Sequence, residues 1–383
     1  MIIALIRRSY TPFGGAERYM ARLVAGLSAA GHRVHILASN WKGPESDDVT
    51  FHRIPAVRKP GWLALLGFIR GCRQLIRREC FDVVFSLERT LCQDIYRAGD
   101  GCHRQWLALK HRHNPLTALL TRLNPIQALT LAIERRLYCD PDLKAIIANS
   151  RQGKEDIIRL YGVAPERIHV VYNGIEPVAT AEADRCQARQ QLENEFAGTV
   201  GLCLLYVGSG FRRKGAATAI AAAAKLAIPF TLFVVGKERR LGHYRRLAQH
   251  LGVADHVIFT GPRTDVNSFY NGCDLFVFPT LYDPFSNATL EAMAHGLPVI
   301  TSRYNGVAEL IEQGVNGFVI DDPEDAATLA DRIMELADDG RRHAMAERAA
   351  CAAAPFTMER NIRETMAVIT RVLSEKTGDM CES

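Results

Sequence analysis

The chain has 383 residues, 48% of them hydrophobic and 23% charged, which is an ordinary globular composition for more than one core. No apolar run approaches the roughly 20 residues that span a bilayer, and Arg7-Arg8 follows the first apolar run, so neither a membrane span nor a signal peptide is expected. Ten cysteines without a Cys-x-x-Cys pair argue against a disulfide framework or zinc site and predict reduced thiols in a cytosolic protein.

Basic residues are concentrated in the first half of the chain. Residues 1–177 carry 26 Lys/Arg against 16 Asp/Glu, a net charge of +10, whereas the remainder carries 21 against 26 and has a net charge of −5. This asymmetry predicts that the first half meets an anionic partner. Nucleic acid, an anionic membrane surface and a phosphorylated acceptor all satisfy it, and charge alone does not choose among them.

Strand and helix signals alternate from the first residue. Ile2–Ile6 has the pattern of a buried strand, Gly14-Gly15 that of a turn, and Ala16–Ala30 that of a helix with one apolar face. Further strands are predicted at Val34–Ala38, Val49–Ile54, Val83–Ser86, Ala145–Ala148 and His169–Tyr172. The alternation indicates a parallel sheet covered by helices on both faces.

The pattern breaks at residues 177–199, a polar stretch that is typical of a linker leading into a new helix. A last helix is predicted from Phe356 to about Leu373. The second set of strands is predicted at Leu202–Val207, Thr231–Val235, Val257–Phe259, Leu275–Phe278, Pro298–Thr301 and Gly317–Ile320. We therefore predict an α/β protein of two doubly wound, Rossmann-like domains. Because ligands bind beyond the carboxyl ends of such strands, two facing sheets predict a cleft between the domains.

Two carboxylates, Asp283 and Glu291, flank the segment Pro-Phe-Ser-Asn-Ala-Thr-Leu at the start of a predicted helix. Ser286, Asn287 and Thr289 are small polar residues suited to a helix N-terminus, which offers N–H groups and partial positive charge to a phosphate or sugar oxygen. The carboxylates can accept hydrogen bonds from vicinal hydroxyls. Together these features predict a nucleotide-sugar site, although an ordinary capped helix with two solvated acids also explains the spacing.

A glycine-rich turn, Gly-Ser-Gly-Phe-Arg-Arg-Lys-Gly at residues 208–215, joins a predicted strand to a predicted helix. Such a turn lets the backbone approach a phosphate, to which Arg213 and Lys214 add positive charge. A basic surface turn is the plainer alternative. A dinucleotide fingerprint is not favoured, because it needs Gly or Ala at the sixth place, where Arg213 would obstruct the packing of helix on strand.

Three further features are weaker evidence of a binding or catalytic site. Gly14-Gly15 is the corresponding turn of the first half, where the Gly15 N–H could donate to an anion, although Gly-Gly is more often only a turn. Asp100 lies in Tyr-Arg-Ala-Gly-Asp-Gly-Cys-His, after a short strand signal, and it or His103 could face a sugar or acceptor hydroxyl; a turn-forming or capping Asp is the alternative. Asp140-Pro-Asp142 resembles a metal motif of some sugar transferases, but a solvated turn is favoured and no metal is assigned.

Two basic, apolar stretches remain. Residues 53–81 carry seven Lys/Arg against one Glu, and we expect their helix at 62–78 to pack on the sheet. Residues 101–133 contain no Asp or Glu, four Lys/Arg and three His, together with Trp106 and several Leu residues. Basic residues mixed with Trp and Leu are what a helix on anionic lipid requires, so this second stretch is predicted to face a membrane.

With these pieces assembled, the chain resembles glycosyltransferase family 4, the retaining enzymes of the GT-B fold. The resemblance lies in Phe13-Gly-Gly-Ala-Glu-Arg18, Ala148-Asn-Ser150, Val171-Tyr-Asn-Gly-Ile175, the 208–215 turn and the segment 283–298, and it spans nearly the whole chain. The Pro-Phe-Gly-Gly start, Arg97-Ala-Gly-Asp100 and Gly-Phe-Arg-Arg-Lys-Gly make it most similar to the bacterial lipopolysaccharide core glucosyltransferases.

The resemblance implies a domain division and roles for individual residues. The N-terminal acceptor domain would comprise 1–177 with the crossing helix 356–373, and the donor domain 178–355. Arg213 and Lys214 would hold the donor diphosphate, Glu291 the ribose, and Asp100 the transferred sugar. The family needs no metal or other cofactor. Candidate catalytic residues are Asp100, Arg213, Lys214 and Asp283, and candidate substrate-binding residues are Gly14, Gly15, His103, Ser209, Arg263 (near the base), Phe285, Asn287, Ala288, Thr289 and Glu291.

One position departs from the family pattern. The family usually has Glu at both ends of the interval that here runs from Asp283 to Glu291. Asp283 is shorter by one methylene, so the reach of its carboxylate to the sugar's 3- and 4-hydroxyls differs.

The sequence therefore predicts a cytoplasmic enzyme, peripheral on the inner face of the membrane. It would transfer a hexose from a UDP-sugar, UDP-glucose first, to a lipid-linked saccharide such as lipopolysaccharide core. A nucleotide-sugar epimerase of the same fold and a non-catalytic nucleotide-sugar-binding protein are the alternatives. No nucleic-acid partner is expected, because no stacking-aromatic motif accompanies the basic charge.

Overall fold

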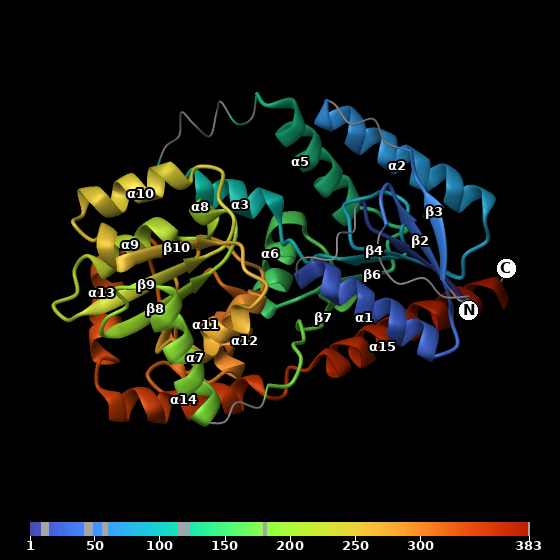
Figure 1. The fold of residues 1–383 in the computed structure, drawn as a ribbon. Helices are drawn as coiled ribbons and strands as arrows, with labels where there is room; N and C mark the ends of the chain where they lie inside the picture. The colour runs from blue at the N-terminus through green and yellow to red at the C-terminus, as the bar shows by residue number, and fades with distance from the viewer. Residues whose placement is uncertain are drawn as a thin grey trace. The chain divides into compact units, whose positions relative to one another are not determined.

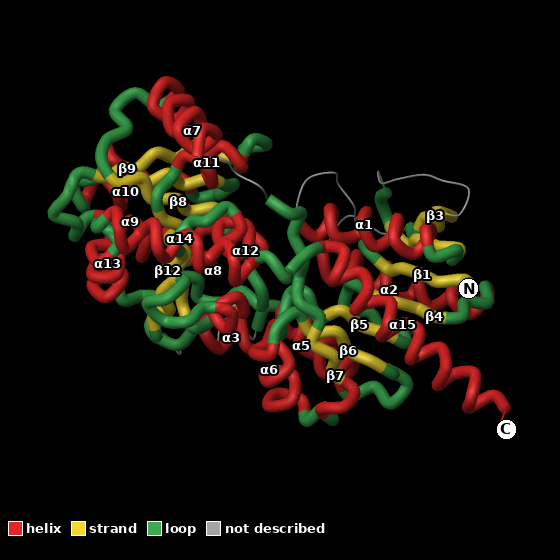
Figure 2. Tube along the Cα trace, turned by 90° about the horizontal axis from the view of Figure 1, so that it is seen from below, coloured by secondary structure: helices red, strands yellow, loops and turns green. Residues whose placement is uncertain are grey.

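The chain forms two compact units, Met1–Gly174 with Met358–Ser383, and Ile175–Thr357. The computed structural model describes residues 1–8, 15–41, 49–55, 60–113, 121, 123–178 and 182–381, except the side chains of 15–18 and 377–381. In each unit the strands lie between helices (Figure 1), and the same layering is visible when the molecule is viewed from below (Figure 2).

Among the described residues, the first unit contains a parallel sheet in the order β3-β2-β1-β4-β5-β6-β7. Its strands are β1 (Ile2–Ile6), β2 (Arg33–Ala38), β3 (Val49–Arg53), β4 (Val83–Ser86), β5 (Ile95–Arg97), β6 (Ala145–Ala148) and β7 (Ile168–Val170). Its helices are α1 (Gly15–Ala29), α2 (Gly61–Arg78), α3 (His103–Lys110), α5 (Pro125–Tyr138), α6 (Arg151–Tyr161), η1 (Pro165–Arg167) and α15 (Met358–Cys381).

Both faces of this sheet are buried, as the apolar runs of its strands predict. Along β1, Ile3 and Leu5 belong to the cluster that includes α1 and α15, whereas Ala4 and Ile6 pack with Phe68 of α2. The alternation of side chains along one strand thus supplies both cores. The prediction that the helix at 62–78 packs on the sheet is confirmed.

The last helix, α15, packs on α1 and extends beyond its predicted end at Leu373. The contact is close, because a Cβ at Gly26 would lie 2.6 Å from Ile362 Cγ2. Strand β7 ends before the predicted Tyr172, since Val171 makes the last backbone bond, from its N–H to Ala148 O at 2.9 Å.

The described residues of the second unit form a parallel sheet in the order β10-β9-β8-β11-β12-β13. The strands are β8 (Leu202–Val207), β9 (Phe230–Val235), β10 (Val257–Gly261), β11 (Leu275–Phe278), β12 (Val299–Ser302) and β13 (Gly317–Ile320). The helices are α7 (Glu182–Glu195), α8 (Phe211–Lys214), α9 (Ala216–Ala223), α10 (Leu241–His250), η2 (Ala254–His256), α11 (Val266–Gly272), α12 (Asn287–Ala294), η3 (Gly306–Leu310), α13 (Ala326–Glu335) and α14 (Asp339–Ala353). The strand order reverses between β8 and β11, which is the doubly wound arrangement.

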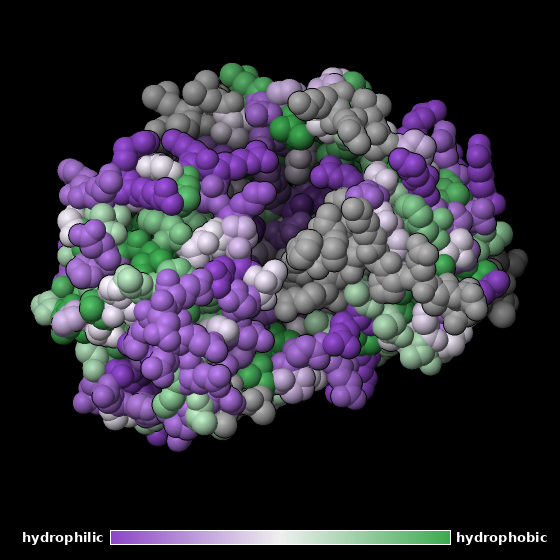
Figure 3. Space-filling model, viewed as in Figure 1, coloured by the Kyte–Doolittle hydropathy of each residue, from purple (hydrophilic) through white to green (hydrophobic). Residues whose placement is uncertain are grey.

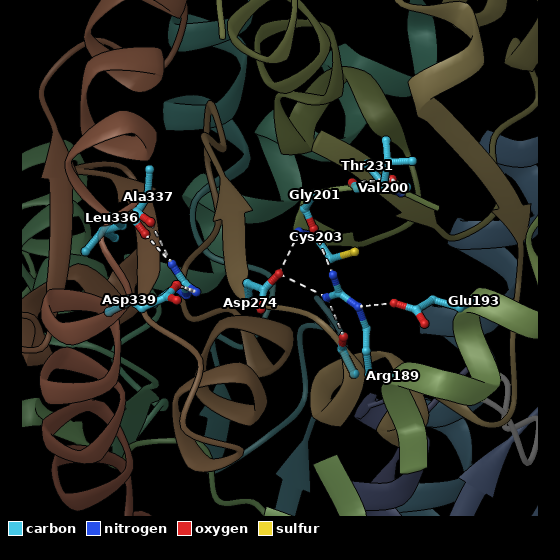
Figure 4. Close-up of polar contacts among 12 residues, drawn as sticks. Arg189, Glu193, Val200, Gly201, Cys203, Thr231, Asp274, Leu336, Ala337 and Asp339 are labelled. Carbon is cyan, nitrogen blue, oxygen red and sulfur yellow. Dashed lines mark hydrogen bonds and ion pairs between the residues drawn. The ribbon is translucent and has the colours of Figure 1, made fainter. Parts of the chain in front are cut away.

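At the edge where these strands begin, Arg189 of α7 ties the helix to the sheet (Figure 4). Its guanidinium donates to Gly201 O at 2.8 Å and to Asp274 Oδ2 at 3.0 Å, and it pairs with Glu193 at 3.0 Å. Asp274 in turn accepts from the Cys203 N–H at 2.7 Å. These contacts hold α7 against the starts of β8 and β11.

On the face of the second unit seen in Figure 3, hydrophilic residues form a band along α10. In the part of the chain that the structure describes, no helix has the length and hydrophobicity to cross a membrane. The cysteines described there are free thiols, and Cys102 and Cys203 are buried.

Candidate active site

The loops after β8 and β11 meet at the carboxyl edge of the second sheet, where the strand order reverses. Gly215 makes this approach possible. Its φ is +76°, and a Cβ there would lie 1.8 Å from Pro279 O, in the loop after β11. Only glycine permits both this backbone conformation and this contact, so the spacing between the two loops depends on it.

Lys214 and Asp283 form an ion pair across these two loops. Their side chains are 13% and 9% exposed, and the Lys214 ammonium lies 5.4 Å from the centre of the Phe278 ring. The Asp283 backbone is fixed on both sides, since its N–H donates to Tyr304 O at 2.9 Å and its carbonyl accepts from the Gly306 N–H at 2.8 Å. The pair therefore places a cation and a carboxylate in set positions at the edge of the sheet.

Arg213 adds a second cation. Its carbonyl accepts from the Leu281 N–H at 2.8 Å and from Thr280 Oγ1 at 2.9 Å, which fixes the backbone. The half-buried guanidinium makes no hydrogen bond or ion pair with any described residue. Burial raises the pKa of the neighbouring Tyr206 hydroxyl well above its usual value, and Arg213 partly opposes that shift. The Arg213 charge is thus available to an anion.

The start of the glycine-rich turn is held by the loop after β9. Ser209 Oγ accepts from the Lys237 N–H at 3.0 Å. The Glu238 carboxylate accepts from the N–H groups of Phe211 and Arg240, each at 2.8 Å. Sequence reasoning did not identify Glu238, because an exposed-looking acid after a strand carries no distinctive signal.

Helix α12 begins at Asn287 with Ser286 as its N-cap. Ser286 Oγ accepts from the Thr289 N–H at 3.2 Å, so that N–H already has a partner within the protein. Asn287 and Ala288, the first two helical residues, are half-buried at the surface, and Phe285 just before the cap is 4% exposed. The capping role predicted for the small polar residues is present, whereas N–H donation by 287–289 to a ligand stays a prediction.

Asn305 organises this helix start, and sequence reasoning missed it. The side chain is 1% exposed. Its amide donates to Thr289 Oγ1 and Thr301 Oγ1, each at 3.0 Å, and its oxygen accepts from the N–H groups of Ser286 at 3.3 Å and Val307 at 3.2 Å. The Asn-Gly dipeptide at 305–306 indicates a turn but gives no sign that the Asn is buried.

Glu291 lies one turn further along α12 and is half-buried, with the Tyr270 hydroxyl donating to its Oε2 at 3.1 Å. His295 stacks on Tyr270 with ring centres 5.1 Å apart, and its Nδ1 lies 2.6 Å from Asn271 Oδ1. Burial, assisted by the charge of Arg185, lowers the pKa of His295 to about 4. His295 is therefore a neutral support at neutral pH.

Arg263 lies just after β10, the edge strand of the second sheet. Its guanidinium pairs with Glu195 and with Asp265, both at 2.7 Å, and it lowers the pKa of the Asp265 carboxyl by hydrogen bonding. Both of these partners belong to the protein. The contact of Arg263 with a nucleotide base stays a prediction.

In the first unit, Asp100 follows β5 and is exposed. Its carboxylate makes no hydrogen bond or ion pair with the described residues. His103, the first residue of α3, is half-buried, and its Nε2 lies 2.6 Å from Gln127 Oε1. Burial lowers the pKa of His103, while Gln127 and Glu134 oppose that shift and Arg89 adds to it.

Three other predicted features remain. Gly14 lies outside the described residues, and Gly15 is the first residue of α1. Asp140 Oδ1 accepts from the Asp142 N–H at 3.1 Å, so Asp140-Pro-Asp142 is the turn that was favoured over a metal motif. Within the described ranges, no three His, Cys, Asp or Glu side chains are grouped so that they could hold a metal ion.

The structure thus collects the predicted donor residues at one edge of the second sheet and the predicted Asp100 and His103 at one edge of the first. In the second unit the cations of Arg213 and Lys214 lie at the same edge as the Asp283 carboxylate and the N-terminus of α12. Groups of these kinds bind phosphate and sugar hydroxyls.

Comparison with known families matches both units. Residues 13–178 match the family described as Glycosyltransferase Family 4, and residues 194–351 match Glycosyl transferases group 1.

Individual relatives cover most of the chain. The lipopolysaccharide glucosyltransferase WaaG of Escherichia coli K12 is 27% identical over 329 residues, 84% of this chain and 86% of WaaG. A crystal structure of WaaG, described as involved in lipopolysaccharide biosynthesis, superposes with a TM-score of 0.83 at 25% identity, covering 96% of this chain and 99% of that chain. The fold is also that of Anabaena HepE in complex with UDP-glucose, with a TM-score of 0.72 at 21% identity over 97% and 100% of the two chains.

Proposed function

Because the chain belongs to the glycosyltransferases of the GT-B fold, with a family 4 domain followed by a group 1 domain, we propose that it transfers a hexose from a UDP-sugar to a lipid-linked saccharide. The observation that carries the proposal is the Lys214–Asp283 pair, with Arg213 beside it, where the order of the second sheet reverses. UDP-glucose is the first donor to test, since WaaG is a glucosyltransferase and HepE binds UDP-glucose.

The two cations fit the charge that develops in such a reaction. When the glycosidic bond to the donor breaks, the departing diphosphate gains negative charge, which Lys214 and Arg213 would stabilise. At an effective dielectric near 20, each cation about 4 Å from that charge contributes roughly 4 kcal/mol before desolvation. Asp283 would accept from sugar hydroxyls, and Glu291 from the ribose. The acceptor hydroxyl would attack on the face that the leaving group departs from, which retains configuration.

The acceptor side is proposed on charge and on the relatives. Residues 1–177 have a net charge of +10, and α3 and the first part of α5 lie in the basic stretch 101–133. We assign this domain to the cytoplasmic, inner face of a membrane and its acceptor to lipopolysaccharide, the substrate class in WaaG's name, with the core saccharide as the first acceptor to test.

An assay of nucleoside diphosphate release, of UDP from UDP-glucose, UDP-galactose and UDP-N-acetylglucosamine and of GDP from GDP-mannose, tests the donor. Release that needs a truncated lipopolysaccharide acceptor supports the proposal. Conversion of the donor without an acceptor would indicate the epimerase, and binding of the donor with no turnover would indicate a non-catalytic protein. Cosedimentation with anionic and with neutral vesicles tests the membrane assignment separately, because the expected binding to anionic vesicles weakens as salt is raised.

A further inference from the structure

The backbone around Asp100 is held by residues from other elements. Asn149 Nδ2, after β6, donates to Gly99 O at 3.2 Å. Gly101, with φ +66°, completes the turn. Asp100 itself stays exposed. The loop between β5 and α3 is therefore a fixed frame that presents one carboxylate.

Arg89 and Glu134 fix the far side of this frame. The Arg89 guanidinium donates to Gly101 O at 2.6 Å and to Glu134 Oε1 at 3.2 Å. The two oxygens of Glu134 accept from the first N–H groups of α3, from His103 at 2.6 Å and from Arg104 at 3.0 Å. One ion pair thus holds the Gly101 carbonyl near the end of the loop and the first amides of the helix.

Glu134 is an unusual choice for its position. It is fully buried on the inner face of α5, next to Ile133 and Leu137, and it is the lone acid between residues 101 and 139. Tyr161 of α6 also donates its hydroxyl to it. Packing alone does not require an acid there, because replacing a buried ion pair by apolar residues is often neutral or stabilising.

We propose that Arg89 and Glu134 are positioning residues for transfer, holding Asp100 and His103 in the geometry that the acceptor hydroxyl and the transferred sugar require. The inference rests on the proposed function, in which those two side chains meet the substrates. Neither Arg89 nor Glu134 touches substrate; both act through the backbone of 99–104.

Kinetics of Glu134→Gln and Arg89→Gln test this in the full-length chain. Because a displacement of about 1 Å can lower a rate 10²-fold, we expect kcat to fall about 10- to 100-fold. The KM for UDP-sugar and the affinity for UDP should stay within about twofold of wild type, since Arg213, Lys214 and Asp283 belong to the other unit. Glu155→Gln, which alters an exposed carboxylate on α6, is the matched control and should be unchanged.

Titration of His103 by NMR separates positioning from general loss of structure. Glu134 opposes the lowering of the His103 pKa, whereas Arg89 and Lys110 contribute to it. Glu134→Gln should therefore lower the His103 pKa and Arg89→Gln should raise it, with the Gln127 contact retained in both. Changes of the His103 pKa that are opposite in sign in the two variants support the proposal. An unchanged His103 pKa in both variants, together with weaker UDP binding, would show a merely structural role.

Tyr161→Phe is the milder variant if Glu134→Gln does not fold, because it removes one of four donors and no charge. We expect kcat to fall about threefold with UDP binding retained. A kcat for Tyr161→Phe and for any folded Glu134 or Arg89 variant equal to the Glu155→Gln control would overturn the positioning role. If the wild-type protein turns over no donor, the proposed function is wrong. The His103 pKa values of Glu134→Gln and Arg89→Gln then still show whether the Arg89–Glu134 ion pair controls the surroundings of His103.

Discussion

Asp283 and Asp100 occupy comparable places, each just beyond the carboxyl edge of a parallel sheet, yet their surroundings are opposite. Asp283 is buried, paired with Lys214 and bonded through its backbone to the loop after β12. Asp100 is exposed and has no hydrogen-bonding partner among the described residues, while the backbone around it is held from several sides.

The difference indicates two modes of preparing a site. In the second unit the charged groups are already arranged against one another, so an anionic donor would meet cations whose positions cost little to fix. In the first unit the carboxylate is left available for a hydroxyl, and the rigidity lies in the frame beneath it.

The largest effect is expected from Lys214→Ala, which removes the paired cation. We expect kcat for UDP-sugar turnover to fall about 10²- to 10³-fold, because one preorganised electrostatic contact is lost where charge develops. The measurement is steady-state UDP release, with the exposed Lys225→Ala as control. Undiminished turnover by a folded Lys214→Ala protein would remove this lysine from the mechanism.

The close approach of the two loops is tested by Gly215→Ala against Gly210→Ala. Both glycines have φ +76°, but a Cβ at 210 meets no atom within 4 Å, whereas one at 215 would lie 1.8 Å from Pro279 O. The left-handed conformation costs Ala about 1–2 kcal/mol at either site, and overpacking adds about 1–3 kcal/mol at 215 alone. Denaturant unfolding measures both, and equal free energies of unfolding would contradict the geometry.

The support beneath Glu291 predicts a pH dependence of stability. Because the folded-state pKa of His295 is about 4, against 6.5 for an ordinary His, the unfolded chain binds more protons between these values. The free energy of unfolding should therefore decrease as pH falls from 6.5 to 4, by about 1–3 kcal/mol from this group. His295→Gln should flatten that dependence relative to the exposed control His250→Gln, and an unchanged slope would place the effect elsewhere.

The smallest effect concerns donor choice. Asp283→Glu restores the residue usual in the family, and the added methylene changes the reach toward sugar hydroxyls. We expect the ratio of kcat/KM between UDP-glucose and UDP-galactose to change by about 10-fold, the scale of one altered polar contact. The same ratio in variant and wild type would show that Asp283 does not set sugar preference.

Local patterns were sufficient for much of the fold. The limits of β1, β4, β6, β8, β11 and β13 coincide with the predicted strands, because short apolar runs between turn residues are typical of buried parallel strands. The Lys214 and Asp283 loops were also identifiable, since glycines, cations and capping residues lie close together in sequence.

Other residues could not be found that way, because their roles depend on contacts distant in sequence. Glu134 is separated from Arg89 by 45 residues, and Asn305 from Thr289 by 16. Only the folded sheet brings such partners together. Glu134 follows directly after the acid-free stretch 101–133, but nothing in the sequence indicates which helix N-terminus it caps.

We propose that the donor binds at the edge of the second sheet between β8 and β11. A crystal structure of the full-length chain with UDP-glucose tests it most directly. We predict diphosphate oxygens about 2.7–2.9 Å from Lys214 Nζ or from the Arg213 guanidinium, and the glucose ring against Asp283. UDP-glucose bound away from Lys214, Arg213 and Asp283 would contradict the account.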